Sequence, residues 1–143
     1  MFGQINETWS CREATLADAE WLQNLFDLRN YTDSTAVEVL STSFVQGSFN
    51  QVTYDIILRD EARGLDVGYR KVTYAPEIKL LTYSFLINVL DHQSSNYFFE
   101  HLKSSLDIDT IHFIEANETN FSQIQTLDPN PEKLRDGSVV VRV

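Results

Sequence analysis

The chain has 143 residues, of which 43% are hydrophobic and 12% aromatic, with only 5 glycines and 3 prolines. This composition predicts a single globular domain over residues 1–143 and excludes disordered, collagen-like and low-complexity classes. The formal net charge is −10. We therefore expect no nucleic-acid partner, because binding to a phosphate backbone requires clustered lysine and arginine.

The predicted compartment follows from three absences in the sequence. Cys11 is the single cysteine, so no internal disulfide can form. The first residues lack the basic and apolar segments of a secretory signal, and no apolar run reaches the ~18 residues of a membrane span. We expect a cytoplasmic protein with no membrane partner.

The first half of the chain alternates between strand and helix patterns. Thr15 stands three residues before Asp18, as in a capping box, and opens an amphipathic helix with Leu22, Leu25 and Phe26 on one face. A second helix is expected around Ala36–Leu40, closed by Gly47. The expected strands are residues 8–13, 51–59 and 66–74, the last two forming a hairpin across residues 60–64.

The stretch from Leu81 to Leu106 organises the rest of the chain. Its first part, with Tyr83, Phe85, Ile87 and Val89, is apolar on both faces and predicts a buried central strand. A polar loop is expected over residues 91–96, followed by a helix with Phe98, Leu102 and Leu106 on one face. A strand that leads through a short loop into a helix N-terminus can bind an anion, since free N–H groups and the helix dipole converge there.

The second half predicts a parallel strand and a terminal hairpin. The strand at residues 109–116 follows the central helix closely, which implies a right-handed crossover between parallel strands. A short helix is expected from Asn117 to Leu127, and Asp136-Gly137 is typical of a hairpin turn. The predicted fold class is α/β or α+β, with a mixed, mostly antiparallel central sheet flanked by helices.

The opening CREATLADAEWLQNLF and the order of elements resemble the GCN5-related N-acetyltransferase (GNAT) family over nearly the whole chain. The resemblance implies a GNAT fold, acetyl-CoA as cofactor and N-acetyl transfer as the reaction. Asn117 falls where the family has an asparagine that contacts the pantetheine arm. The cofactor contacts implied in this way are Val89, Leu90, His92, Gln93, Ser94, Ser95, Asn96 and Asn117.

The sequence departs from the family pattern where the chemistry is concentrated. The stretch Asp91–Asn96, at the position of the pyrophosphate loop, has no glycine or arginine, and Asp91 adds a negative charge beside the expected anion. The family's acid, commonly a tyrosine, would fall near Ile124, and no tyrosine follows Tyr97. Glu77, ahead of the central strand, is the candidate general base. These departures describe a degenerate active site.

Two functions remain open on the sequence alone. The first is an acyl-CoA-dependent N-acetyltransferase with a divergent loop. The second is a catalytically inactive, GNAT-like structural or interaction protein that binds a protein partner or forms a homo-oligomer. In size, and in Asn117 with Arg135-Asp136-Gly137, the chain resembles small GNAT-like phage virion-assembly proteins, which would place it within a phage particle. His92, His101 and His112 lack a second ligand at metal spacing, so no metal site is expected.

Overall fold

The computed structural model describes residues 1–42, 50–89, 94–114, 124–125 and 127–143, with only the backbone of residues 94–96. The described strands form one eight-stranded sheet in the order β1-β2-β3-β4-β5-β6-β8-β7. Their bounds are β1 (Gly3–Gln4), β2 (Trp9–Glu13), β3 (Val52–Asp60), β4 (Leu65–Ala75), β5 (Leu80–Asn88), β6 (Thr110–Phe113), β7 (Glu132–Lys133) and β8 (Val139–Arg142). Only the pair β5 and β6 is parallel among these strands, so the predicted mixed, mostly antiparallel sheet is confirmed.

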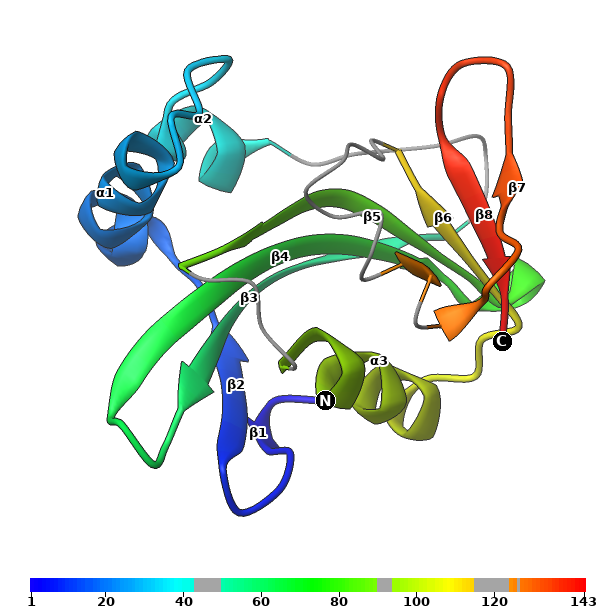
Figure 1. Cartoon of the computed structure of the whole chain (residues 1–143), viewed down its shortest axis with the longest axis horizontal. Helices are drawn as coiled ribbons and strands as arrows, with labels where there is room; N and C mark the ends of the chain where they lie inside the picture. The colour runs from blue at the N-terminus through cyan, green and yellow to red at the C-terminus, as the bar shows by residue number, and fades with distance from the viewer. Residues whose placement is uncertain (43–49, 90–93, 115–123, 126) are drawn as a thin grey trace.

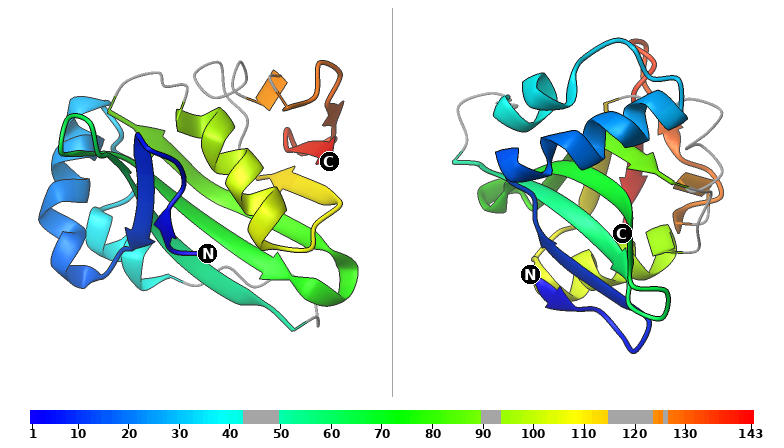
Figure 2. Two further views of the ribbon diagram at one scale, coloured as in Figure 1. Left: turned by 90° about the horizontal axis from the view of Figure 1, so that it is seen from below. Right: turned by 90° about the vertical axis from the view of Figure 1, so that its left-hand side faces the viewer.

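The helices cover both faces of the sheet. They are η1 (Leu16–Asp18), α1 (Ala19–Leu28), α2 (Ala36–Ser41), η2 (Pro76–Ile78) and α3 (Ser94–Ser105). Figure 1 shows α1 and α2 on one side of the curved sheet and α3 on the other, and the views in Figure 2 agree. No helix in the described part of the chain is long and apolar enough to cross a membrane.

The capping box at the start of the first helix forms as predicted. The Thr15 hydroxyl accepts from the Ala17 N–H at 3.3 Å, and the Asp18 carboxylate accepts from the Thr15 N–H at 2.9 Å. These contacts satisfy N–H groups that have no partner within the helix. The second helix ends at Ser41, before the predicted Gly47, and residues 43–49 lie outside the described part.

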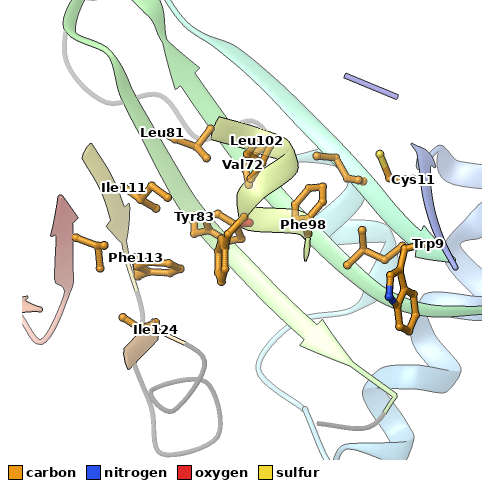
Figure 3. Close-up of a cluster of buried hydrophobic side chains, with 14 of the residues drawn as sticks. Trp9, Cys11, Val72, Leu81, Tyr83, Phe98, Leu102, Ile111, Phe113 and Ile124 are labelled. Atoms are coloured by element: carbon orange, nitrogen blue, oxygen red, sulfur yellow. The ribbon is translucent and has the colours of Figure 1, made fainter. Parts of the chain in front are cut away.

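Each face of the sheet carries its own hydrophobic core. Beneath α3, the side chains of Phe98, Phe99 and Leu102 pack against Leu81, Tyr83, Ile111 and Phe113 from β5 and β6 (Figure 3). On the other face, α1 and α2 cover Ile57, Tyr69 and Ile87. Alternate residues of a strand point to opposite faces of the sheet. On β5 and β6, the residue between Leu81 and Tyr83 and the residue between Ile111 and Phe113 therefore face away from α3.

The structure corrects three details of the predicted elements. Helix α3 begins at Ser94, inside the predicted polar loop, and β6 ends at Phe113 rather than Ala116. The short strand β1 was not predicted, because two residues carry no periodic signal. The terminal hairpin is confirmed, and its Gly137 has φ of 88°, a left-handed conformation that favours glycine.

Candidate functional site

The parallel pairing of β5 and β6 ends midway along β5. Residues Leu80–Tyr83 pair with Thr110–Phe113, and the last contact in the described part of the chain is the Ile114 N–H donating to the Tyr83 carbonyl at 3.0 Å. β5 then continues from Ser84 to Asn88, paired with β4 alone among the described strands. We call the side of Ser84–Asn88 that faces away from β4 the open edge.

A β-bulge lies where the open edge begins. Lys71 pairs with Phe85 while its neighbour Val72 pairs with Tyr83, which leaves Ser84 as the extra residue of β5. The Ser84 hydroxyl donates to the Lys71 carbonyl at 3.3 Å. A bulge bends its strand and increases the local twist, and Ser84 directly follows the last residue of β5 that pairs with β6.

The open edge presents main-chain hydrogen-bonding groups. The Val89 N–H donates to the Val67 carbonyl of β4 at 2.8 Å, and Ile87 pairs with Tyr69. Because main-chain groups alternate in direction along a strand, the N–H and C=O groups of Leu86 and Asn88 point toward the open edge. An extended ligand with amide groups can pair with them as an added strand would.

A polar cluster lies behind the open edge on the α3 face. Arg70 is fully buried and donates through Nη1 to the carbonyls of Tyr69 and Ile87, at 3.1 and 3.2 Å. Burial lowers the pKa of Arg70 to about 10, so the guanidinium stays charged at neutral pH. Burial raises the pKa of the Tyr83 hydroxyl beside it. Arg70 thus ties the end of β5 to β4.

Gly68 makes room for this cluster, which gives a testable prediction. A Cβ at position 68 would lie 2.5 Å from Asn88 Oδ1 and 3.0 Å from Arg70 Nη1. G68A is therefore expected to lower the free energy of unfolding by about 1–3 kcal/mol, the usual cost of overpacking, as measured by urea denaturation. The double variant G68A/N88A should recover part of that loss, whereas equal losses in both variants would contradict the role of Asn88.

A second polar cluster lies on the opposite face, beside α2. The Asp55 carboxylate accepts a hydrogen bond from the Tyr69 hydroxyl and forms an ion pair with Lys71 Nζ at 2.8 Å. Lys71 also donates to the carbonyl of Thr42, the C-cap of α2. Burial and the Asp55 carboxylate raise the pKa of Tyr69, so this hydroxyl keeps its proton. The cluster fastens the end of α2 to the sheet.

The candidate base Glu77 lies at the far end of β5 from Asn88. It is an exposed residue of η2 and accepts a hydrogen bond from Asn50 Nδ2 at 2.8 Å. It precedes Leu80, where β5 is still paired with β6. The structure therefore does not bring Glu77 to the open edge, and its catalytic role stays a prediction.

The predicted cofactor contacts are described only in part. Val89 follows β5 directly and packs, half-buried, on the α1 and α2 core. Ser94, Ser95 and Asn96 form the first residues of α3. Leu90, His92, Gln93 and Asn117 lie outside the described residues. Within the described residues, no group of three histidine, cysteine or acidic side chains is placed to hold a metal.

The fold is similar to that of solved acetyltransferases. One from Salmonella typhimurium, described as modifying the N-terminal serine of a 50S ribosomal subunit protein, has TM-score 0.66 and 11% identity, and covers 98% of each chain. A mutant SpeG spermidine N-acetyltransferase from Vibrio cholerae has TM-score 0.61 and 13% identity, and covers 96% of this chain and 95% of its own.

The aminoglycoside acetyltransferase AAC(6')-Ib, solved with coenzyme A and kanamycin, also has TM-score 0.61 and 13% identity, and covers 94% of this chain and 95% of its own. No protein-family model matches the chain, and no curated protein matches it. At these identities, the likeness establishes the fold.

Proposed function

We propose that this chain, which has the fold of the GCN5-related N-acetyltransferases, binds the pantetheine arm of an acyl-CoA along the open edge of β5. The observation that carries the proposal is the end of β5–β6 pairing at Tyr83, which leaves the main-chain groups of Leu86 and Asn88 without a strand partner in the described residues. Pantetheine is an extended chain with amide groups and fits such an edge. The similar AAC(6')-Ib was solved with coenzyme A and with acetyl-CoA, which supports this ligand.

The phosphate end of the ligand would lie toward the N-terminus of α3. This helix begins at Ser94, shortly after the open edge ends, and free N–H groups at a helix start favour anions. However, the stretch Asp91–Asn96 has no glycine, and Asp91 is acidic. We propose that the phosphates contribute less to binding here than the pantetheine arm does. Val89, Leu90, His92, Gln93 and Asn117 remain proposed contacts.

The proposed reaction is transfer of the acyl group to an amine. The coenzyme supplies the acyl group as a thioester, and the chain positions it on β5. The second candidate is a GNAT-like protein that binds without transfer, as an inactive or interaction protein. The absence of any carboxylate from β5 and the placement of Glu77 favour it. The phage-assembly role rests on the size of the chain and on Asn117 with residues 135–137 of the sequence.

Isothermal titration calorimetry with acetyl-CoA and with S-acetylpantetheine tests the proposal. We expect both ligands to bind, with dissociation constants within about tenfold, or about 1.4 kcal/mol, of each other. Nucleotide without pantetheine, such as adenosine 3',5'-bisphosphate, should bind much more weakly and serves as the control. No heat from either thioester at millimolar concentration would overturn the proposed function.

A further inference from the structure

His112 lies on β6, just before the two parallel strands part. It pairs in register with Thr82 of β5, and the next pair, Tyr83 with Phe113, is the last. Its neighbours Ile111 and Phe113 are buried in the core beneath α3. The His112 side chain therefore occupies the opposite face of the sheet, beside the start of the open edge.

The surroundings of His112 are polar. His112 Nε2 is buried and has no hydrogen-bond partner among the described residues, which is uncommon for a buried polar atom. Thr82 and Thr73 are also buried on this face, and the Thr73 and Thr53 hydroxyls lie 3.2 Å apart. Polar side chains thus follow one row across β3, β4, β5 and β6, at Thr53, Thr73, Thr82 and His112.

Charged groups reach this row from the terminal hairpin. Hydrogen bonds from the Ser138 hydroxyl and N–H, together with the His112 imidazole, lower the pKa of Asp136 in the β7–β8 turn. On β8, Arg142 faces the same side and donates to the Thr110 hydroxyl at 3.1 Å. Across the next two strands, His112 pairs with Val140 of β8, and Val140 pairs with Glu132 of β7. In the other direction, the Lys71–Asp55 ion pair lies toward α2. Asp136 therefore lies within electrostatic reach of His112.

The direction of a bound thioester follows from the proposed function, on which this inference rests. The phosphate end lies toward α3, at the Asn88 end of the open edge. The reactive end of the pantetheine arm therefore lies toward Ser84, where β5 and β6 meet. His112 stands at this junction on the face away from α3, so an acceptor that approaches from that face meets its imidazole.

We propose that His112 is the proton acceptor for a primary amine that takes the acyl group. The amine lone pair forms the new C–N bond with the thioester carbonyl carbon, and the C–S bond breaks. The nitrogen loses one proton to His112, which later releases it to solvent, and the leaving thiolate takes one proton from solvent. An amide and a free thiol result, with no other reactant. Histidine suits this role because it exchanges a proton near neutral pH.

The test compares H112Q and the control H101Q in thiol release from acetyl-CoA with a panel of primary amines. His101 lies on α3, where its Nε2 contacts the Met1 carbonyl at 2.6 Å, so H101Q alters a histidine away from the row. H112Q is expected to lower kcat by about 10²- to 10⁴-fold with acetyl-CoA affinity unchanged. H101Q should stay within about threefold of the native rate.

A further readout separates a catalytic role from a structural one. In NMR spectra, the imidazole signals of His112 are identified by their absence from the H112Q spectrum. In the native protein with coenzyme A, these signals should shift when amine is added, and a lack of shift would overturn the proposal.

An H112Q rate within about threefold of the native rate would also overturn it. Native protein that binds acetyl-CoA but releases no thiol with any amine would overturn the role of His112 and leave the proposed binding intact. Native protein that binds no acetyl-CoA would overturn the proposed function, and the inference with it.

Discussion

Replacing Asp55 with alanine is expected to lower the free energy of unfolding by about 3–5 kcal/mol, the cost of leaving a buried charge without its partner. The Asp55 carboxylate holds both Lys71 Nζ, at 2.8 Å, and the Tyr69 hydroxyl. Lys71 is only 4% exposed, so water cannot readily replace the carboxylate. In D55A, Lys71 Nζ would lose its ion pair and keep its hydrogen bond to the Thr42 carbonyl. Urea denaturation followed by circular dichroism measures the loss.

Two controls distinguish a lost ion pair from a lost side chain. In D55L/K71M both charges are gone, and we expect most of the stability to return, since apolar side chains can replace a buried pair. E61A removes a partner of Arg59 in a surface pair, where both side chains are more than a third exposed, and should cost less than about 1 kcal/mol. If D55A is no more costly than E61A, Lys71 does not depend on Asp55.

Local patterns predicted most of the fold. The capping residues Thr15 and Asp18, the apolar stripe of α1 and the strong strand formers of β3 and β4 each act within a few residues of the chain. The short connection between α3 and β6 was enough to predict that β5 and β6 are parallel strands joined by a helical crossover, and the structure confirms the parallel pairing. Similarity to solved acetyltransferases then confirms the predicted GNAT fold.

The candidate site depended on strand register, which these patterns do not fix. The bulge at Ser84 and the end of β5–β6 pairing appear only when β4, β5 and β6 are aligned. In the same way, Asp55 meets Lys71 because β3 and β4 pair in one register. The sequence did offer one signal for the polar clusters, the consecutive charged residues Arg70 and Lys71 in the middle of an apolar strand. Charged residues are seldom buried without partners, so this pair indicated partners on neighbouring elements. Glu77 was predicted as the general base because it precedes the central strand in the order of elements, and that order gives no distance between Glu77 and the open edge.

The sequence also left open how three consecutive aromatic residues of α3 divide between core and surface. A helix turns by ~100° per residue, so Tyr97, Phe98 and Phe99 cannot share one direction. In the structure Phe98 and Phe99 are fully buried, whereas Tyr97 is 45% exposed. The Phe99 ring lies 5.5 Å from that of Tyr83 on β5 and 5.9 Å from that of Phe113 on β6. Phe99 thus packs against both strands at the point where their pairing ends.

We therefore expect F99A to lower the free energy of unfolding by about 3–5 kcal/mol, through lost burial and the cavity left beneath β5 and β6. Y97A, the adjacent control on the same helix, should change it by less than about 0.5 kcal/mol, as exposed positions usually do. Chemical denaturation of the two variants side by side measures the difference. Equal losses would mean that α3 is rotated about its axis relative to this structure, and the packing beneath the last β5–β6 pair would have to be reassigned.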